Sequence, residues 1–126
     1  MDHDLIDKLQ QELLNEYPQL PWLEVDLGWI PIISDMMKEL SPYFQKDPTF
    51  KIEQVKQKFA GLRVYFSSRE QNYEEINAIV NKSVKRASLT CEMCGATEGV
   101  AVVSPRYWMF NLCPNCFERV KRELKR

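Results

Sequence analysis

The four cysteines constrain this chain more than any other feature, because they form two C-x-x-C pairs near one end. Cys91 and Cys94 make the first pair, Cys113 and Cys116 make the second, and eighteen residues lie between the pairs. This spacing is typical of a site in which four sulfurs surround one zinc ion. In a reducing compartment, where disulfides are rare, metal binding is the favoured use of such pairs. The sequence therefore predicts one zinc ion per chain, bound by these four cysteines.

The predicted zinc is structural, because four thiolates fill a tetrahedral shell and leave no position for a reactive water. Gly95 is expected to supply the unusual backbone conformation of the turn after Cys94, and Pro114 to stiffen the second turn. The alternatives are a redox C-x-x-C and an iron–sulfur cluster. The first lacks its usual β-α-β setting here, and the second usually has a different cysteine spacing.

Apolar residues at helical spacing predict three helices before the cysteines and one after them. They cover residues 4–17, a segment from Pro31 that ends before the stretch SPYFQKDP, residues 72–88, and the basic tail after Cys116. Met36 and Met37 are expected to fill the core on the second helix. The segment between the first two helices, with two prolines and a glycine, predicts an extended connection. Its residues Trp22 and Trp29 are expected to be core anchors.

Alternating apolar and polar residues predict a strand at 62–67. The preceding segment, 52–59, fits either a strand or a helix, and a β-hairpin turning at Ala60 and Gly61 is the preferred interpretation. Two further short strands are expected between the cysteine pairs, within 99–104 and 106–112.

The predicted fold class is α+β. The N-terminal helices are expected to pack on a small antiparallel sheet or hairpin, in a domain covering 1–88. A zinc ribbon with four cysteine ligands and a terminal helix is expected at 89–126, either as a separate module or as part of one domain.

Net charge is divided unequally along the chain. Residues 1–45 hold nine acids against two lysines, a net charge of −7, whereas residues 46–126 hold fifteen Lys or Arg against nine acids, a net charge of +6. One interpretation is that the two parts attract each other within the fold. The other is that the acidic part steers the protein onto a basic partner.

The chain offers little catalytic material. Its single histidine, His3, is near the N-terminus, so a Ser/His/Asp or Cys/His arrangement is excluded, as is a histidine-rich metal-hydrolase site. The acidic N-terminus is unlike a signal peptide and no apolar run is long enough to span a membrane. We therefore predict a cytoplasmic protein that is not an enzyme and does not act in a membrane.

Several of these segments together resemble a group of small bacterial and prophage-encoded proteins. The shared features are Gly28 and Trp29 before the second helix, the segment QVKQKFAGLRVYF at 54–66, and the motifs SLTCEMCG and LCPNC. In that group the last zinc ligand is often a histidine, whereas this chain has Cys116, which keeps a tetrahedral site. The resemblance implies a mobile-element setting, where inhibitors, immunity proteins and regulators are common, and no particular activity.

The leading functional hypothesis is a zinc-binding protein that acts by binding another protein, as an immunity or inhibitor-type accessory factor. The expected partner is basic, such as a toxin or a nucleic-acid-binding enzyme. The acidic surface predicted to meet it consists of Asp2, Asp4, Asp7, Glu12 and Glu16.

The alternative hypothesis is a regulator that binds nucleic acid through the zinc ribbon and the basic tail. Aromatic side chains there could stack on bases, and the cations could contact phosphates. The residues assigned to this surface are Arg106, Tyr107, Trp108, Arg119, Lys121 and Arg122.

Overall fold

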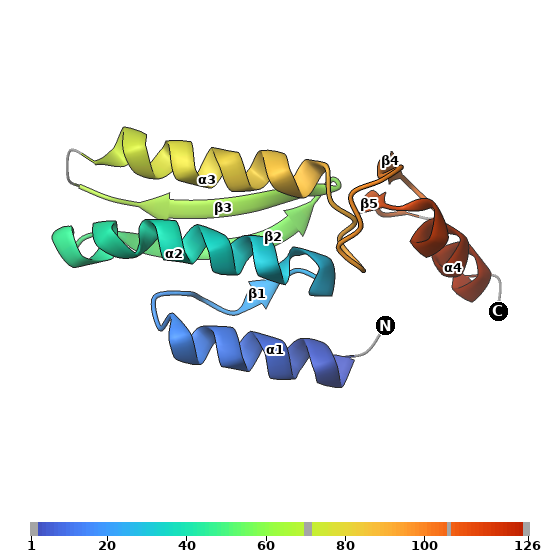
Figure 1. Cartoon of the computed structure of the whole chain (residues 1–126), viewed down its shortest axis with the longest axis horizontal. Coiled ribbons are helices and arrows are strands. Elements are labelled where there is room, and N and C mark those ends of the chain that lie inside the picture. The colour runs from blue at the N-terminus through green and yellow to red at the C-terminus, as the bar shows by residue number, and fades with distance from the viewer. Residues whose placement is uncertain (1–2, 70–71, 106, 125–126) are drawn as a thin grey trace.

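The computed structural model describes residues 3–69, 72–105 and 107–124 of the chain, and it has the predicted α+β composition. Figure 1 shows a larger N-terminal part, in which helices lie on a sheet, and a smaller C-terminal part at one end. The elements, in chain order, are α1 (His3–Glu16), β1 (Leu23–Glu24), the short 3-10 helix η1 (Leu27–Trp29), α2 (Ile30–Lys46), β2 (Lys51–Lys58), β3 (Gly61–Ser67), α3 (Tyr73–Ser88), β4 (Ala101–Val103), β5 (Phe110–Leu112) and α4 (Pro114–Leu124).

The main sheet has the strand order β1-β2-β3. The hairpin β2-β3 is antiparallel as predicted, whereas β1 adds a parallel strand at its edge, with Leu23 beside Val55. Helices α2 and α3 lie side by side over one face of this sheet, and α1 lies beside β1 (Figure 1). A short parallel strand at the edge was not foreseen, because two residues carry no readable alternation.

Strand β2 contains an irregularity that explains why its sequence also fitted a helix. The pairing with β3 shifts between Ile52 and Gln54, so one extra residue is inserted at this point. Ile52 and Val55 are both buried although they are three residues apart, a spacing that a regular strand would place on opposite faces. The strand interpretation is confirmed, and the bulge produced the helix-like spacing.

The hairpin turns one residue earlier than predicted. Its two loop residues are Phe59 and Ala60, with φ angles of 52° and 65°, and the flanking residues Lys58 and Gly61 pair with each other. Gly61 is the first residue of β3. Positive φ at both loop positions is the conformation of the turn whose twist matches a β-hairpin, so here tertiary structure overrides the residue preference.

The main core lies between the sheet and the two covering helices. It centres on Trp29, as predicted, and on Met36 and Met37, all with no exposed surface. The other fully or nearly fully buried members include Leu23, Ile32, Ile33, Leu40, Val55, Leu62 and Ile76. The prediction for Trp22 is wrong, because 53% of its surface is exposed.

Helix α2 continues past the predicted stop and includes Pro42. Proline removes a helical N–H, but its position on the solvent side lets water satisfy the carbonyl that is left without a donor. The turn beyond it carries Phe44, which stacks on Phe50 with 4.1 Å between ring centroids. Packing of this last turn against the core outweighs the local helix-breaking signal.

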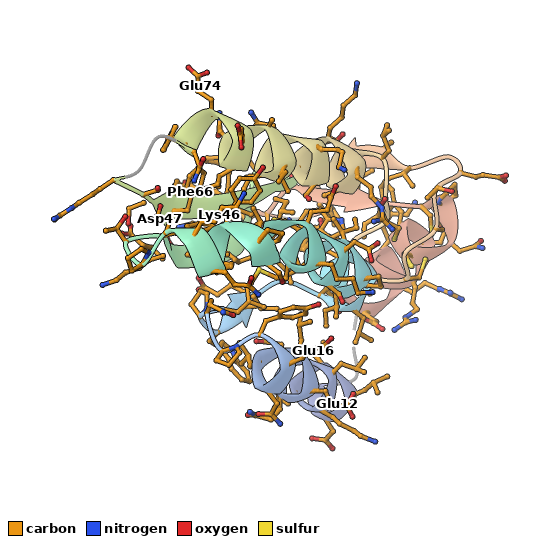
Figure 2. The ribbon with its side chains drawn as sticks, turned by 60° about the vertical axis from the view of Figure 1, so that its left-hand side comes forward. Glu12, Glu16, Lys46, Asp47, Phe66 and Glu74 are labelled. Atoms are coloured by element: carbon orange, nitrogen blue, oxygen red, sulfur yellow. The ribbon has the colours of Figure 1, made fainter. Side chains whose placement is uncertain are left out.

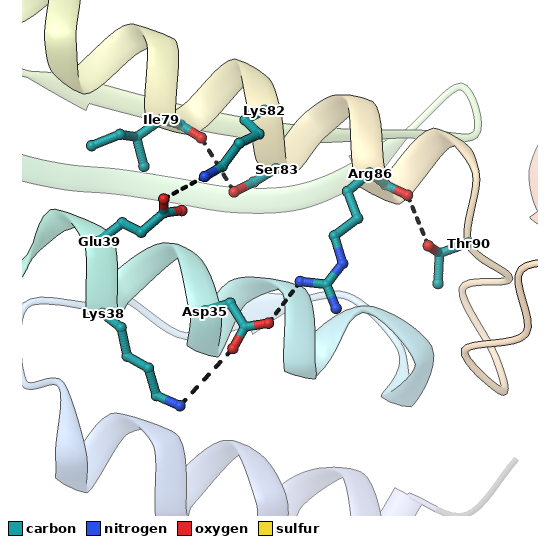
Figure 3. A network of polar contacts seen from close by, with 8 residues as sticks. All are labelled: Asp35, Lys38, Glu39, Ile79, Lys82, Ser83, Arg86 and Thr90. Carbon is teal, nitrogen blue, oxygen red and sulfur yellow. Dashed lines mark hydrogen bonds and ion pairs between the residues drawn. The ribbon is translucent and has the colours of Figure 1, made fainter.

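Two ion pairs join α2 to α3. Arg86 donates to Asp35 at 2.7 Å, and Lys82 pairs with Glu39 (Figure 3). The hydrogen bond and charge of Arg86 lower the pKa of the Asp35 carboxyl. Acidic residues of the N-terminal part thus pair with basic residues of the remainder, as the first charge interpretation proposed. Because the side chains are about half exposed, each pair contributes at most about 1 kcal/mol.

Candidate metal centre

The four cysteines converge on one point at the C-terminal end of α3. Their sulfurs all lie within 4.8 Å of one another, and the sulfurs of Cys94 and Cys113 are 3.7 Å apart. A tetrahedral ion with metal–sulfur bonds of about 2.3 Å requires sulfur–sulfur distances of about 3.8 Å. Cys91, Cys113 and Cys116 are buried and Cys94 is exposed. The cluster can therefore hold one metal ion.

Backbone hydrogen bonds shape the first cysteine pair into a tight turn. The N–H of Gly95 donates to the carbonyl of Cys91 at 2.9 Å, and the N–H of Cys91 donates to the carbonyl of Ala96 at 2.8 Å. Gly95 has a φ of 84°, as predicted from its position after Cys94.

The second pair is formed where β5 meets α4. Pro114 is the first residue of α4, where its missing N–H costs no hydrogen bond, and Cys116 lies in the first turn of the helix. The N–H of Cys116 points to the sulfur of Cys113 at 3.5 Å. The predicted strands between the pairs are present as the shorter β4 and β5, which pair antiparallel.

The cysteine environment opposes the accumulation of negative charge. Burial raises the pKa of the Cys94 and Cys116 thiols, and the neighbouring cysteines raise that of Cys116 further. The N–H of Cys116 instead lowers the pKa of Cys113 to about 7. Four thiolates at this spacing require a compensating cation, which a bound divalent metal would provide.

Gly28 brings the first cysteine turn into direct contact with the N-terminal part. Its N–H donates to the carbonyl of Glu92 at 2.8 Å. A Cβ added at Gly28 would lie 2.1 Å from the carbonyl oxygen of Cys91 and 2.7 Å from the nitrogen of Gly95. Only glycine permits this approach, so the first cysteine turn lies against η1, just before α2, at backbone distance.

A buried carboxylate strengthens the same contact. Glu92 is 5% exposed and accepts hydrogen bonds from the N–H of Asn111 at 2.8 Å and from the amide of Gln57 on β2 at 3.1 Å. Burial raises its pKa, against the opposing effect of these donors. The indole N–H of Trp29 adds a bond of 3.0 Å to the carbonyl of Thr90. We refer to these contacts of Gly28, Trp29, Gln57, Glu92 and Asn111 as the seam.

Asn111 also ties the metal centre to α3. Its side-chain amide donates to the carbonyls of Ala87 at 3.0 Å and Ser88 at 2.8 Å, at the end of the helix. The Ala87 carbonyl also accepts the N–H of Thr90 at 3.1 Å, so a side chain from β5 adds to the backbone cap at this helix end. The helix end and the second half of the centre therefore hold each other in place.

The predicted acidic surface is divided by the structure. Asp2 lies outside the described residues, and Asp4, Asp7, Glu12 and Glu16 are exposed on α1. Glu12 and Glu16 flank a hollow between α1 and the start of α2, and Figure 2 shows them on α1 at the side of the molecule away from α3. Asp7 lines a different depression, next to the C-terminal part.

The predicted nucleic-acid surface is also divided. Arg106 lies outside the described residues, Tyr107 is 92% exposed, and Trp108 donates its indole N–H to Gln57. On α4, Arg119 pairs with Glu123 and Lys121 with Glu118, and Arg122 is exposed.

The depression beside Asp7 is a groove of about 520 Å³ between the N-terminal part and the metal centre, which we call the seam groove. One wall comes from α1, β1 and the residues after it, and from Gln57. The other comes from the cysteine-containing part. The lining residues are Ile6, Asp7, Gln10, Trp22, Leu23, Glu24, Val25, Asp26, Gln57, Glu92, Met93, Trp108, Phe110, Val120 and Glu123.

Sequence reasoning missed Trp22 and Gln57 as residues of this groove. The signal near Trp22 was its acidic neighbours in the sequence, Glu24 and Asp26, which suit a surface better than a core. Gln57 gave no signal, because its partners Glu92 and Trp108 are distant in the sequence.

No helix in the described part of the chain is long and apolar enough to cross a membrane. Comparisons with protein-family models, with curated proteins and with solved structures found no match to this chain.

Proposed function

We propose that this protein binds one structural zinc ion and acts, without catalysis, by binding another protein in the manner of an inhibitor or immunity factor. The observation that carries the proposal is the seam groove, an aromatic-lined depression whose two walls are held together at the metal centre. A binding surface built in this way needs the metal for its shape. Zinc would then act as a scaffold for recognition.

Zinc is the metal that the donor set favours. Four cysteine sulfurs at tetrahedral spacing suit zinc or iron, and zinc carries no redox chemistry that would damage the exposed Cys94. The site needs a compartment that keeps its thiols reduced, which agrees with a cytoplasmic location. Elemental analysis of protein purified without chelator should give one zinc per chain, and an equivalent of iron would contradict the assignment.

A non-enzymatic role is supported by the polar groups of the groove. The described carboxylates include Asp26, which accepts the N–H of Leu27, and Glu92, which is held by Gln57 and Asn111. The carboxylates of Asp26 and Glu92 therefore accept hydrogen bonds within the fold. The described lining contains no histidine, serine or cysteine that could pair with them as a nucleophile or base.

The test is photocrosslinking in the native host with p-benzoylphenylalanine placed at Trp22, followed by native mass spectrometry of the purified complex. A matched position is Glu74, which is exposed on α3 far from the groove (Figure 2). We expect a stoichiometric protein partner that crosslinks from position 22, does not crosslink from position 74, and is released by chelation. A zinc-loaded protein that carries no partner, or that carries nucleic acid released by salt, would overturn the proposal.

A further inference from the structure

We propose that the seam groove binds an arginine or lysine side chain carried on an exposed segment of a partner protein. This inference rests on the proposed protein-binding function and adds the chemistry of the ligand. The groove combines an apolar floor with exposed aromatic rings and one sign of charge. A long side chain with an apolar stem and a cationic end matches that combination.

Charge selects the cation. Every charged residue among the described lining residues is acidic, namely Asp7, Glu24, Asp26, Glu92 and Glu123. Asp7 and Glu24 are exposed and stand on the wall formed by the N-terminal part. Carboxylates within an apolar groove attract a cation more strongly than carboxylates in open solvent, because the surrounding dielectric is lower. The same carboxylates repel phosphate, which disfavours nucleic acid as the occupant.

Two indole rings favour the same ligand. Trp22 is 53% exposed and Trp108 is 46% exposed, although both line the groove. Tryptophan is the aromatic residue that binds cations best. Trp108 is held by its bond to Gln57 and by stacking on Phe59, so one ring is already fixed in place before a ligand arrives.

The polar groups of β1 limit how a partner can bind. The buried Gln10 side chain accepts from the N–H of Leu23 at 2.7 Å and donates to its carbonyl at 2.8 Å. The amide thus takes the place of a neighbouring strand at this edge of the sheet. A partner strand therefore cannot pair with Leu23, which disfavours strand addition at this edge and agrees with recognition of a side chain.

The test uses the three indole N–H signals in the NMR spectrum of the 15N-labelled, zinc-loaded full chain. Trp29 is buried with its N–H bonded to Thr90, so its signal is an internal reference. The probes are blocked pentapeptides, Gly-Ser-X-Ser-Gly, in which X is arginine, lysine or the neutral arginine isostere citrulline. We expect the Trp22 and Trp108 signals to shift with arginine and lysine, and not with citrulline, while Trp29 stays fixed.

Two double variants with the same change in net charge give the control. Asp7→Asn with Glu24→Gln removes carboxylates of the groove, and we expect about fivefold weaker binding of the arginine peptide. Glu12→Gln with Glu16→Gln removes exposed carboxylates of α1 outside the groove and should leave the affinity within about twofold. Equal losses in the two variants would show long-range attraction only and would overturn the inference.

Other occupants give distinct results, each of which overturns the inference. Shifts of Trp22 and Trp108 with protein concentration alone would identify a second copy. Peptide binding that appears only after deletion of residues 125–126 would identify the chain's own tail. Signals that stay fixed at millimolar arginine peptide would show that no cation binds. If any of these results coincides with a stoichiometric partner that crosslinks from position 22, protein binding stands and only the cationic ligand is rejected.

Discussion

Gly28 brings the backbone of the N-terminal part against the first cysteine turn. The space for any larger residue is closed by backbone atoms of Cys91, Glu92 and Gly95, and backbone does not move aside as a flexible side chain does. A methyl group here must either separate the two parts or distort the first cysteine turn. We therefore expect both the stability of the fold and the affinity for metal to depend on glycine at position 28.

We expect Gly28→Ala to lower the free energy of unfolding by roughly 2 to 4 kcal/mol and to weaken zinc binding, because relief of the clash displaces the turn that carries Cys91. Urea denaturation with zinc in excess and competition with a chromogenic chelator measure the two effects. Gly61→Ala is the matched control, since its Cβ would meet nothing closer than 3.5 Å. Equal stability of the two variants would contradict the close approach.

Gln10 supports a second prediction at this scale. Replacing it by glutamate puts an oxygen in place of the donor to the Leu23 carbonyl, inside the core. We expect Gln10→Glu to cost about 2 to 3 kcal/mol at neutral pH, through an unpaired carbonyl and a buried charge. Gln11→Glu, on the exposed neighbour, should change stability by less than about 0.5 kcal/mol. Thermal denaturation of the two variants under one condition decides the question.

Single residues also show how far the sequence could predict the site. The spacing of the four cysteines predicted that they come together, and the structure places their sulfurs within 4.8 Å of one another. Trp22 and Trp29 have the same residue type and lie in the same segment, yet one is exposed and the other buried. The difference depends on Thr90 and the cysteine turn, which are far away in the sequence, so local reasoning could not separate the two residues.

Among the elements, the β2-β3 hairpin stands out because its turn residues suit the conformation poorly. Phe59 and Ala60 both hold positive φ, where asparagine and glycine are preferred, and where other residues lose about 1 kcal/mol or more each. The exposed Phe59 ring stacks on Trp108 of the groove, with 6.5 Å between centroids. The Phe59 side chain thereby supports the ring of Trp108.

The helices were predicted more accurately than the strands for a physical reason. Helix periodicity extends over ten or more residues, and α1, α3 and α4 each carry it. The end of α2 was misplaced because the stop signal of Pro42 is local, whereas the packing of Phe44 on Phe50 is not. The bulge in β2 and the two residues of β1 depend on pairing partners, which no single segment reveals.

At the turn itself, we expect Ala60→Gly to raise the free energy of unfolding by about 1 kcal/mol, because glycine adopts positive φ without steric cost. Chemical denaturation measures the change. Ala87→Gly is the control for loss of the methyl group, since Ala87 is buried in the regular helix α3, where glycine should be destabilising by about 1 kcal/mol. A loss of stability in both variants would show that the turn carries no strain.

At the scale of the whole molecule, the described residues form two hydrophobic clusters of very different size. The larger one lies between the sheet and the helices and includes seventeen buried residues, from Leu13 to Ala87. The smaller one surrounds the metal centre, and its buried members are Leu112 and three of the cysteines. A cluster of this size is too small to stabilise β4, β5 and α4 by itself, so we expect the C-terminal part to depend on a bound metal and on the seam.

Chelation should therefore unfold the C-terminal part and leave the larger core folded. In small zinc domains the apparent free energy of zinc binding is about 10 to 16 kcal/mol, which is far more than the contacts of the seam can contribute. After removal of zinc, hydrogen exchange followed by mass spectrometry should show loss of protection in β4, β5 and α4, while α2 and α3 stay protected by the larger core. The indole NMR signal of Trp108 should change when β4, β5 and α4 lose protection, because the groove that Trp108 lines is then lost.

Re-addition of zinc, but not of magnesium, should restore protection. Simultaneous loss of protection in all helices would show that the seam joins both clusters into one cooperative unit, and unchanged protection everywhere would show that the cysteine cluster needs no metal.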